Sequence, residues 1–338
     1  MHPKAFPRLL SVVMIIAASG CDNAAWEGID VEVRPPPPNP GAAAEFDGAD
    51  QTGPLELETV LYLVERQEGS RATAIPVAQI SGDNYVPLPE EWEVNEFLER
   101  FPLERWEGGS ELRLLVDDQE IGRFLVQSTL EPDASTCRLR PQAVGFLETR
   151  DEMRDRARFL AVARTERPGA RFPAEVPPPL EDAALEARAT NMVERVLLDL
   201  GAPWPASIPE ARGAFRSFPL GSSGLPAVAM TLAVEDDLTV GPSPPSAYGL
   251  FILGTDVNGT YDPLFSWYQQ SDEGGKAVAA VVDFYDLRSR GTPDFLLEVF
   301  GQEDRWFAVL GSGEEGWELL HQDSCGVAAE AEAVRSYP

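Results

Sequence analysis

Short apolar runs, separated by polar and glycine-marked turns, dominate the second half of the chain. Seven runs follow one another at short spacing and predict β-strands at 227–234, 247–254, 263–268, 277–284, 295–300, 306–310 and 317–321. Strands joined by short turns pair antiparallel, and this many of them is typical of a sandwich, a barrel or a propeller-like sheet. The pattern therefore predicts a C-terminal β-rich domain over 216–338, with one of these three architectures.

Alternating apolar positions also recur in the first half of the chain. They predict strands at 57–64, 73–80 and 143–149, and a hairpin that pairs 111–116 with 122–126 across a short acidic turn. A short helix is expected around 91–100. We expect these elements to form a small antiparallel β-domain over 57–149.

The segment 150–215 has a different period. Its clearest feature is a helix over 181–200, whose apolar residues recur at three- and four-residue spacing. They are Leu185, Ala189, Met192, Val193, Val196, Leu197 and Leu200. Such a stripe is expected to pack on a sheet. The charged stretch 148–167 is also predicted to be partly helical, with an apolar face at 159–163. The segment is therefore interpreted as a helical connector in an α+β, mostly antiparallel β protein.

A basic start and a short apolar run precede the first cysteine. The run at 9–18 is shorter than the roughly 20 residues that a membrane-spanning helix needs. The small residues before Cys21 resemble the lipobox of bacterial lipoproteins, although Ala18 stands where that motif usually has Leu. In that family the cysteine is lipid-modified and becomes the new N-terminus. The alternative is an ordinary secretory signal with a chance cysteine.

The lipobox resemblance implies a signal peptide at 1–20 and acylation, for example with palmitate, of Cys21. It places the protein in the bacterial cell envelope, lipid-anchored to a membrane, with the globular part periplasmic or extracellular. Residues 21–56 are proline-rich and carry small and acidic side chains without an apolar period, which predicts a stiff tether. The expected partners are the lipid bilayer, through Cys21, and an envelope protein.

Two cysteines remain besides Cys21. Export places Cys137 and Cys325 in an oxidising space, where an even pair predicts one disulfide. The loop that it closes is well over a hundred residues long, for which the chain-entropy model gives a stabilisation of about 4–5 kcal/mol. The alternative is two buried free thiols.

The formal net charge of the chain is −29 at pH 7. This much negative charge argues against nucleic acid or anionic lipid as a partner surface. It is compatible with cation binding or with solubility alone.

Two acidic turns, each containing a glycine, stand between strand-like runs near the C-terminus. The first contains Asp256, Asn258 and Asp262, and the second contains Asp286 and Asp294. Several oxygens that converge on a tight turn are the ligands that calcium prefers. Both turns are therefore candidate calcium sites. The alternative is plain hairpin turns, whose aspartates bond their own backbone.

The second turn resembles the D-x-D-x-D-G-x-x-D/E loop of the FG-GAP (integrin α-type) repeats, which bind calcium in the blades of a β-propeller. Asp286, Gly291 and Asp294 match the first, glycine and last acidic positions, whereas Arg288 and Arg290 occupy two ligand positions. These arginines repel calcium and could themselves pair with the two aspartates. The resemblance covers about 70 residues and implies an interaction module rather than an enzyme.

Catalytic motifs are weak in this sequence. His321 is the only histidine after His2, and we expect it on the surface near a strand end. The densest acidic cluster, Glu235-Asp236-Asp237, is expected to be an exposed turn. The sequence thus favours a non-catalytic envelope lipoprotein with a binding or scaffolding role and no required cofactor. The alternative is an envelope hydrolase that acts on glycans through a pair of carboxylates, which sequence spacing cannot identify.

Overall fold

The protein is mostly antiparallel β-structure with a few helices, as predicted. The computed structural model describes residues 58–88, 94–106, 109–164, 182–221, 225–272, 275–325 and 334–337. The expected signal peptide and the whole expected tether, with Cys21, lie outside these ranges. Every pair of strands in the described ranges is antiparallel. None of the helices described there is long and apolar enough to cross a membrane.

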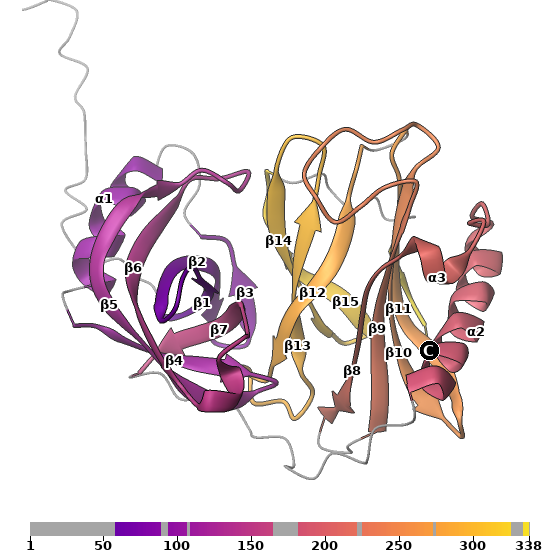
Figure 1. The fold of residues 1–338 in the computed structure, drawn as a ribbon, viewed down its shortest axis with the longest axis horizontal. Coiled ribbons are helices and arrows are strands. Elements are labelled where there is room, and N and C mark those ends of the chain that lie inside the picture. Colours follow the sequence, from indigo (N-terminus) through magenta and orange to yellow (C-terminus); the bar gives the residue numbers. More distant parts are fainter. Residues whose placement is uncertain are drawn as a thin grey trace, which may run out of the picture. The chain divides into compact units, whose positions relative to one another are not determined.

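The first domain is a six-stranded barrel (Figure 1). Its strands, in spatial order, are β1 (Thr59–Arg66), β7 (Arg158–Ala163), β4 (Glu111–Val116), β5 (Gln119–Asp133), β6 (Arg140–Thr149) and β2 (Arg71–Ser81). The barrel closes because β1 pairs with β2 as well as with β7. The short strand β3 (Asn84–Val86) pairs antiparallel with the end of β2. Helix α1 (Val94–Arg105) buries Phe97 and Phe101 in the barrel core.

Strand β7 corrects the sequence analysis. The stretch 148–167 was predicted to be partly helical, but the only helical turn described in it is a 3₁₀ turn at Asp151–Met153, and 158–163 is a strand. This run is fully apolar in its middle because both of its faces are buried, so it shows no alternation. A short apolar run of this kind does not distinguish a strand from a helix by its period alone.

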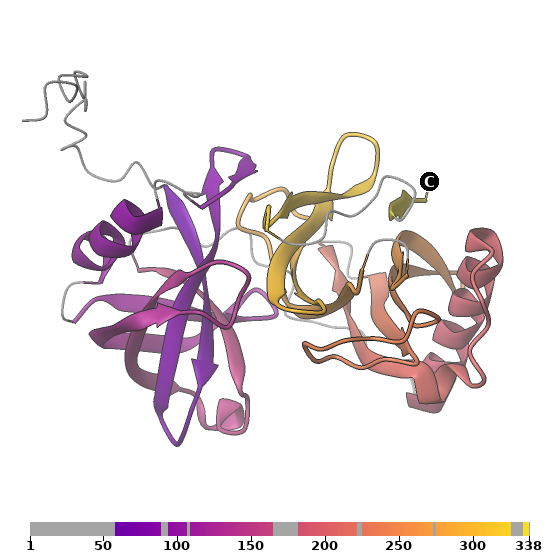
Figure 2. The ribbon, with the colours of Figure 1, turned by 90° about the horizontal axis from the view of Figure 1, so that it is seen from above.

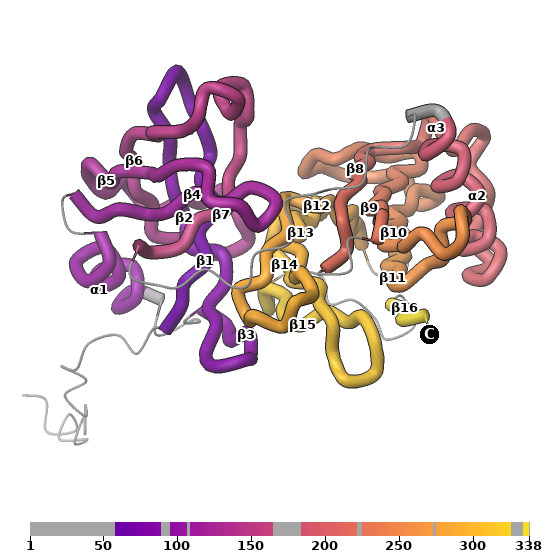
Figure 3. Tube along the Cα trace, turned by 90° about the horizontal axis from the view of Figure 1, so that it is seen from below, coloured from indigo at the N-terminus to yellow at the C-terminus, as the bar shows by residue number. Residues whose placement is uncertain are grey.

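The C-terminal region consists of two antiparallel sheets that pack face to face. The five-stranded sheet contains β16 (Val334–Ser336), β11 (Thr260–Gln270), β10 (Tyr248–Val257), β9 (Leu225–Val234) and β8 (Arg212–Leu220), in that order. The four-stranded sheet contains β12 (Val278–Tyr285), β13 (Asp294–Phe300), β14 (Arg305–Ser312) and β15 (Trp317–Gln322). Buried residues of both sheets form one core, so this region is a sandwich. Figure 3 shows β16 beside β11.

Helix α2 (Asp182–Leu200) packs on the outer face of the five-stranded sheet, as its apolar stripe predicts (Figure 2). Its close approach requires a glycine in β10, because a Cβ at Gly254 would collide with the sulfur of Met192. The short helix α3 (Ile208–Ala211) follows and leads into β8. The sandwich therefore has a helix on one face.

The opposite face of the sandwich packs on the barrel. Apolar residues of β1 and β2 form a shared core with residues of β13 and β14. Four buried carboxylates of the sandwich also accept hydrogen bonds from barrel side chains. The pairs are Asp283 with Arg156, Asp294 with Tyr85, Glu298 with Arg158, and Asp323 with Arg140. Buried charges must be paired because an unpaired one is costly. These pairs therefore keep the buried carboxylates of the sandwich partnered where it packs on the barrel.

Candidate functional site

A cavity of about 920 Å³ lies at one end of the five-stranded sheet. Its walls come from the α2–α3 connection, α3, the end of β9, the long β9–β10 connection and the residues just before β12. This volume is in the range of small-molecule sites, which are typically about 300–1,000 Å³. The cavity is therefore the candidate ligand site of the described residues.

One wall of the cavity is apolar and aromatic. Trp204 stands between Pro203 and Pro205, and its side chain is 52% exposed. Flanking prolines restrict the backbone to extended conformations, so the chain cannot fold this tryptophan back into a helix. The hydroxyl group of Tyr248 donates a hydrogen bond of 2.6 Å to the carbonyl oxygen of Pro203. This bond attaches the tryptophan-bearing segment to the sheet.

The other wall is acidic and is formed by the residues that follow β9. The side chain of Asp236 is buried, and one of its oxygens lies 2.6 Å from Nζ of Lys276. Lys276 is only 2% exposed, and it is the one lysine of the chain besides Lys4. Ser243 donates a further hydrogen bond to Asp236. The ion pair therefore positions the start of the β9–β10 connection against the segment that precedes β12.

The neighbours of Asp236 remain in contact with water. Glu235 has a positive φ of 54°, which is rare for a residue with a long side chain, and it accepts a hydrogen bond from Ser246. The hydroxyl group of Thr239 donates to Asp237, and this hydrogen bond lowers the pKa of the Asp237 carboxyl group. Asp237 is therefore ionised at neutral pH.

The net charge of the lining is negative. Four carboxylates, those of Glu210, Glu235, Asp236 and Asp237, stand against the one ammonium group of Lys276, which leaves a charge of −3. The lining contains no arginine. The expectation that Glu235-Asp236-Asp237 is an exposed turn was wrong for Asp236, since Lys276 draws its side chain inward.

The first acidic turn is a two-residue hairpin turn between β10 and β11. Asn258 and Gly259 have φ values of 54° and 87°, as an Asn-Gly type I′ turn requires. Asp256 accepts a hydrogen bond of 2.6 Å from the backbone N–H of Gly259. This is the backbone-bonded alternative that the sequence left open.

Helix α2 supplies partners for the aspartates of this first turn. Arg188 donates to Asp256 at 3.1 Å, and Arg195 donates to Asp262 at 2.9 Å. Both guanidinium groups stand where a cation would otherwise neutralise the carboxylates. The turn therefore helps to hold the β10–β11 hairpin against the helix.

In the second turn the arginine alternative is confirmed for one aspartate. Arg288 donates two hydrogen bonds, of 2.8 and 2.6 Å, to Asp294. Burial raises the pKa of Asp294, and the guanidinium group of Arg288 opposes this rise. Asp286 instead accepts from the backbone N–H groups of Arg290 and Gly291, at 2.8 Å each.

The residues of the two turns do not fit a calcium ion. Calcium takes six to eight oxygen ligands, whereas these carboxylates are already occupied by guanidinium or backbone N–H groups. Among the described residues, no group of three His, Cys, Asp or Glu side chains could hold a metal ion. The FG-GAP resemblance stays a prediction, and calcium does not enter the proposed function.

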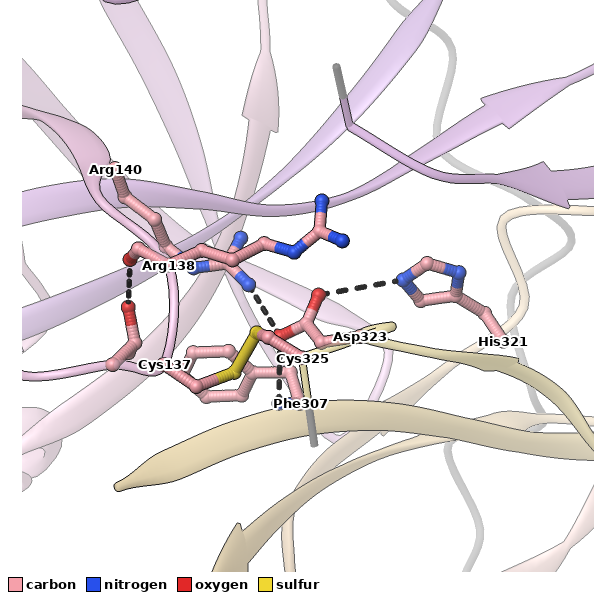
Figure 4. Close-up of a disulfide and its surroundings, with 8 residues drawn as sticks. Cys137, Arg138, Arg140, Phe307, His321, Asp323 and Cys325 are labelled. Atoms are coloured by element: carbon pink, nitrogen blue, oxygen red, sulfur yellow. Dashed lines mark hydrogen bonds and ion pairs between the residues drawn. A yellow bond between two sulfur atoms is a disulfide. The ribbon is translucent and has the colours of Figure 1, made fainter. Parts of the chain in front are cut away.

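The predicted disulfide is confirmed. Cys137 and Cys325 are bonded across a sequence separation of 188, with their Cα atoms 5.8 Å apart (Figure 4). Cys137 belongs to the β5–β6 connection of the barrel, and its backbone N–H also bonds the carbonyl oxygen of Arg305 in β14. Cys325 follows β15. The disulfide therefore links the barrel covalently to the sandwich. Cys21 lies outside the described residues, so its acylation stays a prediction.

His321 is buried, which corrects the expectation that it lies on the surface. Its Nε2 atom is 3.7 Å from a carboxylate oxygen of Asp323. Burial alone would raise the pKa of Asp323, but the charge of Arg140, with help from His321 and the backbone N–H of Phe307, lowers it to about 2. Figure 4 shows these groups around the disulfide. The Arg140–Asp323 ion pair and the disulfide link the barrel to the sandwich.

Sequence reasoning missed Trp204 and Lys276. The second had a signal, because a single lysine in the part after residue 20 is unusual in a chain with many arginines. Trp204 had none beyond its flanking prolines. Comparisons with protein-family models, with curated proteins and with solved structures found no match for this chain.

Proposed function

We propose that this chain is a non-catalytic ligand-binding lipoprotein of the bacterial cell envelope, anchored through an acylated Cys21. The single observation that carries the binding role is the cavity of about 920 Å³ beside Trp204. Its walls combine an apolar surface with a few polar groups, which is the usual composition of a small-molecule site. The lipobox-like sequence before Cys21 supports the anchor.

The packing around the cavity supports binding by a preformed site. The hydrogen bond from Tyr248 to the carbonyl oxygen of Pro203 holds the wall that carries Trp204. Lys276 and Asp236 fix the acidic wall from inside. A site that needs little ordering loses less free energy on binding its ligand.

The carboxylates in the cavity are the observation that favours the second candidate function, a glycan hydrolase. A general acid at neutral pH needs a raised pKa, which usually comes from burial without a cationic partner. In this cavity the buried acid, Asp236, is paired with Lys276, and the pKa of the exposed Asp237 is lowered. The acids therefore serve binding better than proton transfer.

The binding role is tested by a thermal-stability screen of the full chain in non-ionic detergent against a broad library of charged and neutral metabolites and glycans. A compound at 100 times its Kd should raise the free energy of unfolding by about 2.7 kcal/mol. Replacing the exposed lining residue Ala206 with Trp should obstruct part of the cavity and reduce the effect. The matched control is Ala134→Trp on the barrel, which should preserve it.

Several outcomes would contradict parts of this proposal. If no compound stabilises the wild-type protein, or if Ala206→Trp responds like Ala134→Trp, the cavity is not the ligand site. Release of cleaved glycan products, detected by mass spectrometry and lost in Glu235→Gln, would favour the hydrolase. Absence of labelled palmitate on the protein, or its persistence in Cys21→Ala, would refute the anchor.

A further inference from the structure

The cavity separates an aromatic, apolar surface from an acidic one. Trp204 and the neighbouring prolines form the first, and the residues after β9 form the second. A ligand that fills both must have an apolar part and a part that suits carboxylates. We propose that the cavity binds an organic cation, an ammonium group carried on an apolar stem; this inference rests on the proposed binding function.

The exposed acids of this cavity differ in their partners from the buried acids of the sandwich. Buried carboxylates elsewhere, such as Asp283 and Glu298, are each held by two arginines. Glu210 and Glu235 form no ion pair with another described residue, and no arginine lines the cavity. Glu210 and Glu235 are exposed in the cavity, so their carboxylates are accessible to a cationic ligand.

Lys276 does not neutralise the carboxylates of Glu210 and Glu235. Its ammonium group is 2.6 Å from Asp236 and 3.7 Å from Asp237, so it neutralises the buried acid and sets the position of the loop. Three of the four carboxylate charges remain uncompensated. An anionic ligand would be repelled by them, and a neutral ligand could donate hydrogen bonds to them but would gain no attraction from the net charge of the cavity. A cation is attracted.

Trp204 adds an independent reason to expect a cation. Among aromatic side chains the indole ring binds ammonium groups best, through the negative potential of its face. An exposed tryptophan that is held in an extended segment between two prolines offers such a face at little conformational cost. The cavity of about 920 Å³ has room for a stem beyond the ammonium group.

The experiment compares cations with neutral molecules of the same shape. Isothermal titration of the full chain in non-ionic detergent uses choline against 3,3-dimethylbutan-1-ol, and hexylammonium against hexan-1-ol. We expect the cation of at least one pair to bind at least tenfold more tightly than its neutral counterpart, and its affinity to fall as salt is raised.

Variants locate the site. Glu235→Gln removes one charge without changing the shape of the side chain, and Trp204→Leu removes the aromatic face but keeps an apolar surface. Each should weaken cation binding at least threefold. The matched control is Glu314→Gln, on the exposed turn between β14 and β15 and outside the cavity lining. It should leave cation binding unchanged.

Equal binding of cation and neutral isostere, or no binding of either cation, would overturn the inference. So would an equal loss in Glu314→Gln and Glu235→Gln. If the metabolite screen finds a neutral or anionic compound whose effect is reduced in Ala206→Trp, the binding function stands and the cation inference falls. If the screen finds no compound at all, both fall.

Discussion

Replacing Arg140 with methionine removes one partner of a buried ion pair between the barrel and the sandwich. The side chains of Arg140 and Asp323 are 2% and 4% exposed. Arg140 also donates to the carbonyl oxygen of Pro76 at 2.7 Å and lies over the ring of Phe307. Methionine keeps much of the apolar contact but leaves the carboxylate of Asp323 without its guanidinium partner. Breaking a buried pair in this way costs about 3–5 kcal/mol.

The loss of stability in Arg140→Met should depend on pH, because the variant leaves the titratable carboxyl group of Asp323 without its guanidinium partner. In the wild-type protein its pKa is lowered from the ordinary 3.8 to about 2, which corresponds to about 2 kcal/mol. A lowered carboxyl pKa stabilises the fold above the unfolded-state pKa, and this contribution is lost as pH falls from about 4 to about 2. Without Arg140, burial raises the pKa of Asp323. As pH falls, the carboxyl group of the variant is protonated, and the cost of burying its charge is removed.

The assay is urea denaturation of wild type and Arg140→Met at pH 7 and at pH 3. We expect the difference in free energy of unfolding to be about 3–5 kcal/mol at pH 7 and clearly smaller at pH 3. The control is Arg154→Met. Arg154 forms a salt bridge with Asp151, and their side chains are 78% and 99% exposed, so this salt bridge should contribute little to stability at either pH. A difference that does not change between the two pH values would refute this reasoning.

Three further predictions concern the cross-link and the turns. Cys137→Ser with Cys325→Ser should lower the free energy of unfolding by up to about 5 kcal/mol, since the bond closes a loop with a separation of 188; an unchanged urea midpoint would contradict the chain-entropy account. Asn258→Val should cost about 1–2 kcal/mol, because a β-branched residue fits a positive φ poorly, whereas Asn258→Gly should leave the melting temperature nearly unchanged; equal effects would argue against the turn type. Melting in EDTA and in millimolar calcium should coincide, because the turn carboxylates already have partners; a saturable rise that is lost in Asp256→Ala would restore the calcium hypothesis.

Local sequence patterns were sufficient to predict most of the secondary structure. All seven strands expected in the C-terminal region are present, and so are the 111–116 hairpin and the α2 helix. The reason is that alternation and three- to four-residue periods are carried by neighbouring residues. The Asn258-Gly259 turn was likewise visible as an acidic, glycine-marked turn, because turn geometry depends on residues only two positions apart. The disulfide followed from an even cysteine count once export was assumed.

Other features had no local signal. Strand β7 is buried on both faces only because the barrel and the sandwich enclose it, which removes the alternation that identifies a strand. His321 is buried by the same packing. The arginine partners of Asp256 and Asp262 come from α2, and that pairing follows from where the helix crosses the sheet.

The sequence by itself determined where most strands and helices form, because each is encoded by residues within one short window. Only the tertiary structure decided which charges meet and where the cavity opens. Trp204, Asp236 and Lys276 are separated by tens of residues, and they share one cavity because β9 ends, and β10 and β12 begin, at the same side of the sandwich. Sheet order and register set these distances, and both arise from long-range pairing that no local period records.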